Sequence, residues 1–291
     1  MTTRIVKARQ LRDLKHFIAL DASWHMPNSA RNPNDEYLSK HLPQARRWDL
    51  DKIASNHPDG FVGHMLPSPA IFASACSQLG IERNSQVLLY DTVGVFSAPR
   101  AAFTFRAMGH PNVAVLDGGL PAYEREGLPV ESGEYVSQRS EYPVPTLEKN
   151  FIKDHIDILN TIERKDSVIL DARPQPRFAG AAPEPRQGLS SGHMPGALSL
   201  AFPQLLQDGQ LKSPEELRAV FENTLGKQQL DMVLEGKKDV ITSCGSGMTA
   251  AIVALALEVI GGHSSIYDES WTGYAQRYNS PITPLASLTP R

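Results

Sequence analysis

Cysteine is scarce in this chain, because only Cys76 and Cys244 among the 291 residues carry a thiol. Two widely separated cysteines cannot form the disulfide framework of a small secreted protein, and they fit a reducing compartment. Together with the nine histidines they show no metal-ligand spacing. The sequence therefore predicts neither a disulfide-stapled fold nor a metal site, and no cofactor is expected.

An excess of positive charge is also missing, because 29 basic side chains face 32 acidic ones and the formal net charge is −3. Proteins that bind nucleic acid usually carry a basic patch or a basic excess, so no nucleic-acid partner is expected. The longest apolar run, 250–257, is too short to span a bilayer, and no membrane segment is expected. A chain of 291 residues favours two domains.

The chain does contain an internal repeat. The apolar run that ends at Asp21 is matched by one that ends at Asp171, and the run that ends at Asp91 is matched by one that ends at Cys244. The offset between matching segments stays between 150 and 153 residues. Each half reads as strand, loop, strand, helix, strand and helix. This order predicts an α/β fold of two tandem domains, each a parallel sheet flanked by helices.

The expected domain boundaries follow from this repeat and from a proline-containing polar stretch between the halves. Residues 1–137 are expected to form the first domain, 138–147 a linker and 148–291 the second domain. The halves are chemically unequal, because Asp91 stands where the second half has a cysteine, and a carboxylate cannot accept a sulfur atom. Residues 226–238 have no counterpart in the first half and are expected to form a surface insertion.

The stretch around Cys244 predicts a nucleophile. Residues 240–243 have the composition of a strand, 244–247 (C-G-S-G) that of a tight turn, and 248–260 that of a buried helix. Cys244 therefore lies between a strand end and a helix N-terminus, where unpaired backbone N–H groups and the helix dipole favour an anion. Both effects stabilise the thiolate, which is the reactive form of cysteine.

Other interpretations of the cysteines are weaker. Cys76 shares a predicted helix face with Phe72 and Leu79, so it is expected to be buried and inert. The residues after Cys244 formally fit a G-x-G-x-x-A dinucleotide fingerprint, but only 23 residues follow Asp268, too few for the further strands of such a domain. A cysteine phosphatase would need the arginine of a C-x5-R motif, which this loop lacks.

The letters C-G-S-G-M-T-A, which begin at Cys244, resemble the C-G-S-G-V-T-A loop of 3-mercaptopyruvate sulfurtransferases in the rhodanese superfamily. The resemblance covers nearly the whole chain, including an inactive first half with an aspartate at the cysteine position. It implies that Cys244 takes sulfur from 3-mercaptopyruvate as a persulfide, releases pyruvate and passes the sulfur to a thiol or another nucleophile. The neighbouring residues that would hold the donor are Gly245, Gly247, Met248, which replaces the usual valine, and Thr249.

A second motif bears on the sulfur donor. Thiosulfate sulfurtransferases carry C-R-K-G in this loop, with two cations for a doubly charged donor, whereas the two residues after the cysteine are neutral here. Residues 172–188 resemble the mercaptopyruvate family's segment in which two arginines hold the donor's carboxylate and keto oxygens, and they match Arg177 and Arg186. A planar guanidinium can bind a carboxylate through two hydrogen bonds. Arg173, in the same segment, has no assigned role.

The resemblance also implies a proton relay of serine, histidine and aspartate. The matching residues are Ser246 in the cysteine loop, His64 in G-H-M-L-P and Asp51 in W-D-L-D. Gly63 replaces the acid that the family has before this histidine. The alternative for His64 is a surface histidine without a role.

Two other functions stay open from the sequence, thiosulfate sulfurtransferase and a persulfide relay for tRNA thiolation. The expected acceptor is thioredoxin or another thiol, and a relay would use a cysteine desulfurase or a sulfur-carrier protein. The basic segment 1–16 could be a mitochondrial presequence, but the resemblance implies a helix there, before a first strand at Ile18. A cytoplasmic location is therefore expected, with the mitochondrion as the alternative. Trp271 and Tyr274 are expected to pack at the domain interface.

Overall fold

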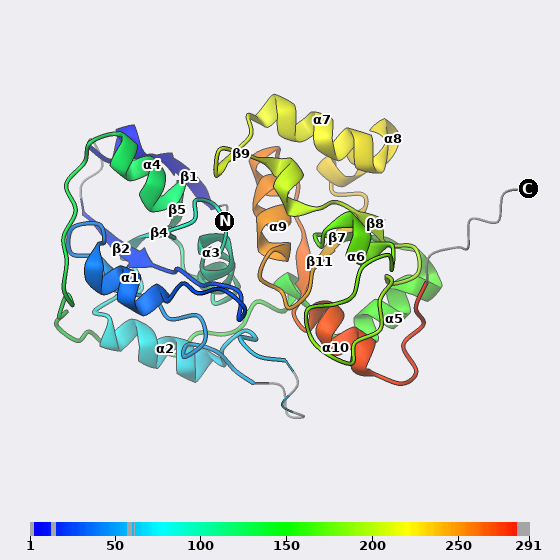
Figure 1. Ribbon diagram of the computed structural model, residues 1–291, viewed down its shortest axis with the longest axis horizontal. Helices are drawn as coiled ribbons and strands as arrows, with labels where there is room; N and C mark the ends of the chain where they lie inside the picture. The colour runs from blue at the N-terminus through cyan, green and yellow to red at the C-terminus, as the bar shows by residue number, and fades with distance from the viewer. Residues whose placement is uncertain (1–2, 13–15, 57–59, 61, 284–291) are drawn as a thin grey trace, which may run out of the picture. The chain divides into compact units, whose positions relative to one another are not determined.

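The computed structural model describes residues 3–12, 16–56, 60 and 62–283. It divides into two compact units, each built on a five-stranded sheet (Figure 1). The first unit comprises Met1–Ser55, Leu66–Glu148 and Leu206–Leu211, and the second comprises Asn56–Met65, Lys149–Leu205 and Lys212–Arg291. Two short segments, Asn56–Met65 and Leu206–Leu211, thus belong to a different unit from the residues on either side of them in the sequence.

The sheet of the first unit is parallel throughout, with the strand order β1-β5-β4-β2-β3. Its central strands are near-continuous apolar runs, as expected for a parallel sheet covered on both faces. The strands are β1 (Arg4–Lys7), β2 (Phe17–Asp21), β3 (Arg46–Arg47), β4 (Gln86–Tyr90) and β5 (Val113–Asp117). The helices are η1 (Ala8–Arg12), a 3-10 turn, and α1 (Pro33–Ser39), α2 (Pro69–Gln78), α3 (Ala98–Ala107) and α4 (Gly119–Arg125).

The second unit repeats this arrangement, with the parallel order β6-β12-β11-β7-β8. The expected duplication of a parallel α/β unit is therefore confirmed. The strands are β6 (Ile152–Lys153), β7 (Ser167–Asp171), β8 (Leu198–Ser199), β11 (Asp239–Ser243) and β12 (Ser265–Tyr267). The helices are η2 (Lys149–Phe151), α5 (His155–Arg164), α6 (Gln175–Phe178), η3 (Phe202–Leu205), α7 (Pro214–Leu225), α8 (Lys227–Leu234), α9 (Ala250–Val259) and α10 (Ser270–Gln276).

A small antiparallel hairpin, β9 (Leu206–Gln207) and β10 (Gln210–Leu211), belongs to the first unit. The N–H of Leu211 donates to Asp117 Oδ1 (2.8 Å), and the N–H of Val95 donates to the carbonyl of Gly209 (2.8 Å). A Cβ on Gly94 would lie 2.5 Å from that carbonyl oxygen, so only glycine allows this approach. The hairpin thus covers the loop that follows β4.

Two expectations about local structure were wrong. The helix expected before Ile18 is instead strand β1 and one 3-10 turn, because Val6 is buried and β1 finds a parallel partner in β5; residues 1–2 and 13–15 of that segment lie outside the described residues. Helix α9 begins two residues later than expected, because the N–H groups of Ala251 and Ile252 donate to the carbonyls of Met248 and Thr249, which makes a tighter turn before the helix. By contrast, residues 226–238 lie at the surface as expected, and they contain α8, in which only Leu230 and Val233 are buried.

Helix α9, drawn in orange beside β11 in Figure 1, is apolar around its circumference, as expected for a buried helix. In the described part of the chain, no helix has both the length and the apolar character needed to cross a bilayer. Since the strands of each sheet are parallel, their carboxyl ends meet at one edge, where ligands bind in α/β folds. Asp171, Cys244 and Asp268 lie at this edge of the second sheet.

The core of the first unit contains a buried histidine. His110 Nδ1 lies 2.9 Å from the hydroxyl of Tyr142, and its Nε2 lies 2.8 Å from the carbonyl of Ser85. A neutral ring satisfies both bonds, with Nε2–H donating to the carbonyl and Nδ1 accepting from the hydroxyl. Burial is the main cause that lowers the pKa of His110 from 6.5 to about 4.

This histidine predicts a loss of stability in mild acid. The unfolded chain binds a proton at His110 below pH 6.5, whereas the folded chain resists it down to about pH 4. The free energy of unfolding should therefore fall as the pH drops through this window, by about 3 kcal/mol from this group. Urea unfolding of the wild type and of His110→Asn at several pH values checks this, because the variant should lose stability less steeply. Parallel curves for the two proteins would contradict the assignment.

Candidate active site

Cys244 directly follows β11, which lies between β7 and β12 in the sheet. Its N–H donates to Ser270 Oγ (3.1 Å), and its carbonyl accepts from the N–H of Trp271 (2.9 Å). Both main-chain groups of the cysteine are therefore held by the first turn of α10. The side chain is 2% exposed, so the sulfur lies within the loop.

The loop after Cys244 offers several unused backbone donors. Residues 244–249 carry the chain from β11 to the first turn of α9. Within the part of the chain that the structure describes, four N–H groups of this loop have no hydrogen-bond acceptor, those of Gly245, Ser246, Met248 and Thr249. Unpaired donors at a helix N-terminus favour an anion at this place.

The matching loop of the first unit shows what such donors hold. Asp91 follows β4 as Cys244 follows β11. Its carboxylate accepts five backbone N–H groups at 2.9–3.0 Å, from Val93, Gly94, Phe96, Ser97 and Ala98. The first loop is one residue longer, seven residues (91–97) against six (244–249), since α3 begins at 98 and α9 at 250. In the first unit a carboxylate of the chain itself thus occupies an amide cradle.

The structure brings Ser246 and His64 together within the second unit. Ser246 Oγ lies 2.8 Å from His64 Nε2, and the two side chains are nearly buried. His64 has a left-handed φ of +43°, which is uncommon outside glycine and fixes the direction of its side chain. The interpretation of His64 as a surface histidine is therefore wrong.

Asp51, the expected acid of the relay, lies in the first unit. Its carboxylate oxygens accept from the indole Nε1–H of Trp24, at 3.0 and 3.1 Å. This bond holds Asp51 in a defined orientation. Its role as the third member of the relay stays a prediction.

The two predicted donor-binding arginines both lie beside the cysteine loop, and they differ in their partners. Arg177 is paired with Glu184, and its Nη2 would lie 3.4 Å from a Cβ added at Gly245. Arg186 donates from Nη1 to the hydroxyl of Thr272 (3.0 Å) and has no carboxylate partner among the described residues. Burial lowers the pKa of Arg186, and the nearby Cys244 opposes this shift. Arg186 is therefore the arginine of this pair whose guanidinium can bind the carboxylate of a ligand.

Arg173, which the sequence left without a role, is buried and structural. Its guanidinium pairs with Asp171 (2.6 Å) and with Glu184 (2.8 Å), and it lies 4.2 Å from the ring centre of Trp271. Glu184 thus bridges Arg173 and Arg177, and orders the segment that carries both of them. The sequence alone does not show that Asp171 and Arg173 form an ion pair, because the pairing depends on how this segment folds.

Two site residues were missed, Ser270 and Thr272, which contact the cysteine loop from α10. Their sequence, E-S-W-T-G, gives a single signal: small hydroxyl residues just after an acidic strand end. Trp271 and Tyr274 pack in the core of the second unit itself, stacked on each other with ring centres 5.6 Å apart. We expected them to pack at the domain interface and did not predict their place in this core.

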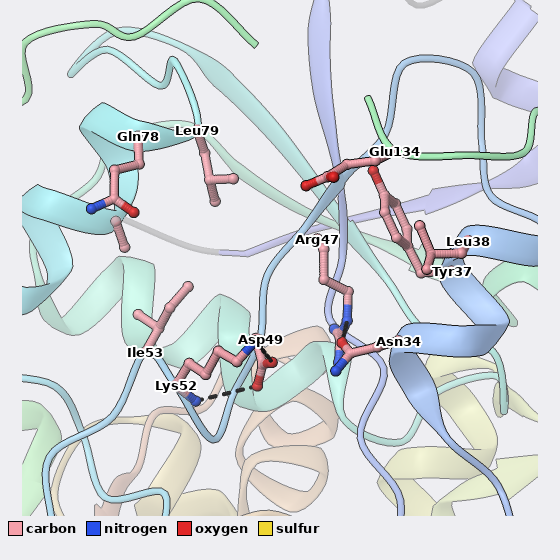
Figure 2. Close-up of a pocket in the computed structure, with 11 residues that line it drawn as sticks. Asn34, Tyr37, Leu38, Arg47, Asp49, Lys52, Ile53, Gln78, Leu79 and Glu134 are labelled. Carbon is pink, nitrogen blue, oxygen red and sulfur yellow. Dashed lines mark hydrogen bonds and ion pairs between the residues drawn. The ribbon is translucent and has the colours of Figure 1, made fainter. Parts of the chain in front are cut away.

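The remaining thiol and the other cavities offer less chemistry. Cys76 is fully buried and burial strongly raises its pKa, so it is inert as expected. A cavity of about 490 Å³ in the first unit is lined by Arg47, Asp49 and Lys52 among others (Figure 2). Three of its charged side chains have partners, because Lys52 pairs with Asp49 and Arg47 donates to Asn34 and to three backbone carbonyls. No group of three metal-ligating side chains occurs among the described residues.

Comparisons with known proteins identify the family of this chain. The family model of the rhodanese-like domain matches residues 12–126 and 155–277. Thiosulfate/3-mercaptopyruvate sulfurtransferase 2 of Arabidopsis thaliana is 40% identical over 92% of this chain and 82% of its own length. A probable 3-mercaptopyruvate sulfurtransferase of Schizosaccharomyces pombe is 37% identical over 93% of this chain and 90% of its own.

A solved structure extends the similarity to the fold. SseA of Escherichia coli, described as having the rhodanese fold of 3-mercaptopyruvate sulfurtransferases, superposes with a TM-score of 0.79 at 33% identity. The match covers 93% of this chain and 99% of that one. With two matched domains and relatives along most of its length, the chain belongs to the rhodanese family, as a tandem-domain member.

Proposed function

We propose that the protein is a 3-mercaptopyruvate sulfurtransferase that carries sulfur as a persulfide on Cys244. The observation that carries this proposal is the loop after Cys244, in which four N–H groups have no acceptor among the described residues, whereas the N–H groups of the matching loop in the first unit hold a carboxylate. The second half can run thiol chemistry, whereas Asp91 excludes it from the first. The names of two curated relatives support the same reaction, since both include 3-mercaptopyruvate sulfurtransferase, and the name of the Arabidopsis thaliana relative also includes thiosulfate.

The first step moves sulfur from the donor to the enzyme. The Cys244 thiolate attacks the sulfur of 3-mercaptopyruvate, an S–S bond forms, and the donor's C–S bond breaks. The bonding electrons leave on carbon as the enolate of pyruvate. That enolate takes the proton of the former thiol, so that pyruvate and an anionic persulfide result. The loop N–H groups then stabilise the outer sulfur.

The second step returns the cysteine to its starting form. A thiolate of the acceptor attacks the outer sulfur, a new S–S bond forms, and the Cys244 thiolate leaves. Thioredoxin or another thiol is the proposed acceptor, and a cysteine desulfurase or a sulfur-carrier protein is the alternative partner. No metal or cofactor takes part in either step.

The arginines bind the donor. Arg186 would take the donor carboxylate, because it is half-buried and has no carboxylate partner among the described residues. Arg177, already paired with Glu184, would reach the keto oxygen from the side of Gly245. These contacts would place the donor sulfur next to Cys244, so that the energy of binding holds the two sulfur atoms in a reactive geometry.

The donor experiment separates this function from its nearest alternative. Purified protein is assayed with 3-mercaptopyruvate and with thiosulfate, each with thioredoxin as acceptor, and kcat/KM is compared. A clear preference for 3-mercaptopyruvate is expected. A preference for thiosulfate would support the runner-up enzyme. Persulfide on Cys244 only after incubation with a desulfurase, detected by mass spectrometry, would support a relay for tRNA thiolation.

The Ser246–His64 pair predicts a proton-transfer role with a measurable size. Replacing Ser246 by alanine or His64 by glutamine should lower kcat for pyruvate release by roughly 100-fold. Because the two side chains form one hydrogen-bonded unit, the double variant should be little worse than either single one. Steady-state kinetics of the three variants checks this. Full activity of the single variants would leave the pair with a purely structural role.

The compartment is proposed to be the cytosol, with the mitochondrion as the alternative. One relative from Arabidopsis thaliana carries the word mitochondrial in its name. In this chain the basic residues Arg4 and Lys7 lie in β1, a strand of the first sheet. Cell fractionation of the tagged full-length protein distinguishes the two locations.

A further inference from the structure

Three consecutive residues at the start of α10 bind the cysteine loop. Ser270 Oγ accepts the N–H of Cys244 (3.1 Å), and the N–H groups of Trp271 and Thr272 donate to the carbonyls of Cys244 and Gly245, both at 2.9 Å. All three residues are almost completely buried. Ser270 has a left-handed φ of +50°, a conformation that costs energy outside glycine and that the surrounding contacts maintain. This turn is therefore a built support for the nucleophile.

The hydroxyl of Thr272 connects this support to the donor-binding arginine. Its Oγ1 lies 2.6 Å from the carbonyl oxygen of Gly245 and 3.0 Å from Arg186 Nη1. A hydroxyl has one proton, and the carbonyl can only accept it. The hydroxyl therefore donates to Gly245 and accepts from Arg186, so each bond has a fixed direction.

The other arginines of this segment are held in a different way. Arg173 is held by Asp171 and Glu184, and Arg177 by Glu184. Arg186 has a neutral hydrogen-bond partner instead, which holds the guanidinium, and it forms no ion pair with a carboxylate among the described residues. A carboxylate partner would have competed with an anionic substrate, whereas a hydroxyl does not.

We infer that Thr272 is a positioning residue of the sulfur-transfer reaction, whose hydroxyl ties Arg186 to the carbonyl next to Cys244. The tie fixes the distance between the group that binds the donor carboxylate and the nucleophile that takes the donor sulfur. Without it, the long arginine side chain would sample several rotamers, and the bound donor would lose its alignment. The inference rests on the proposed function.

The matched variants are Thr272→Val and Thr272→Ser. Valine keeps the shape of the buried side chain and the main-chain bond from residue 272 to Gly245, and removes only the hydroxyl. Serine keeps the hydroxyl and should retain the wild-type KM within about 2-fold. Thermal unfolding of each variant, measured alongside, separates lost stability from lost positioning.

Pyruvate release from 3-mercaptopyruvate, with thioredoxin present, is measured for the wild type, both variants, Arg186→Gln and the Thr272→Val/Arg186→Gln double variant. Thr272→Val should raise KM by about 5- to 20-fold and change kcat by less than about 3-fold. In the Arg186→Gln background the same substitution should change kcat/KM by less than about 2-fold, because Thr272 acts through Arg186.

The outcomes separate this inference from the proposed function. An unchanged KM in Thr272→Val, or an equal effect of that substitution in both backgrounds, would overturn the role of Thr272 while the enzyme remains active. Failure of serine to restore the KM would do the same. A wild-type protein that releases no pyruvate would instead overturn the proposed function, and the inference with it.

Discussion

Cys244→Ser is expected to abolish pyruvate release from 3-mercaptopyruvate, with kcat reduced by at least roughly 10⁴-fold. A serine hydroxyl is not ionised near neutral pH and does not attack a sulfur atom, so no S–S bond can form. The substitution changes one atom of a side chain that is 2% exposed, and the hydrogen bonds of its main chain to α10 do not involve the sulfur. The fold should therefore persist, which circular dichroism can check.

The other cysteine provides the matched control. Cys76 lies in α2, in the core of the first unit. Cys76→Ala removes that thiol without burying a hydroxyl, and should leave kcat/KM per folded molecule unchanged. Mass spectrometry of donor-treated wild type should find one added sulfur atom, on the peptide that contains Cys244. Added sulfur on Cys76, or turnover by Cys244→Ser, would exclude the proposed mechanism.

Much of this site could be predicted because its information is local. The run that ends at Ser243, the glycines after Cys244 and the apolar helix that follows are contiguous, and each has its own composition signal. The repeat adds long-range information, since the matching of the two halves is enough to align Asp91 with Cys244. The structure confirms the parallel sheets, and it places Arg177 beside Gly245 and Arg186 beside Thr272 of α10, which contacts Gly245.

The features that escaped prediction depend on tertiary contacts. Strand β1 has four residues, and nothing local shows that its partner is β5, more than one hundred residues later in the chain. The hairpin of β9 and β10 belongs to the first unit because Gly94 and Gly209 allow close backbone approach, which composition does not show. Segment 56–65 carries His64 into the second unit. These contacts are determined by tertiary packing and not by the local conformational preferences of the residues.

Thr272 illustrates the same limit at the level of one side chain. A threonine at the start of a short helix is ordinary, and its pattern carries no chemistry. Its meaning comes from two partners, Gly245 and Arg186, that are far from it in sequence. Sequence reasoning could identify the charged and nucleophilic groups of the site, whereas the neutral groups that orient them became visible with the fold.

Arg186→Gln is expected to reduce kcat/KM for 3-mercaptopyruvate by roughly 30- to 1000-fold, equivalent to about 2–4 kcal/mol of transition-state binding. Arg186 has no carboxylate partner among the described residues, so its charge is available to the donor. Glutamine can still hydrogen-bond, but it lacks the charge and the two parallel donors of a guanidinium. Steady-state kinetics should show most of the loss in KM, since the carboxylate is bound in the ground state as well.

Arg177→Gln is the matched control for that result. Arg177 forms an ion pair with Glu184, and Glu184 would keep its ion pair with Arg173 after the substitution. The loss of kcat/KM should therefore be smaller than for Arg186→Gln, even though both arginines flank the cysteine loop. Arg186→Lys should recover part of the activity, because it restores the charge without the planar fork. Equal impairment of the two glutamine variants, or a larger loss in Arg177→Gln, would contradict the assignment of the donor carboxylate to Arg186.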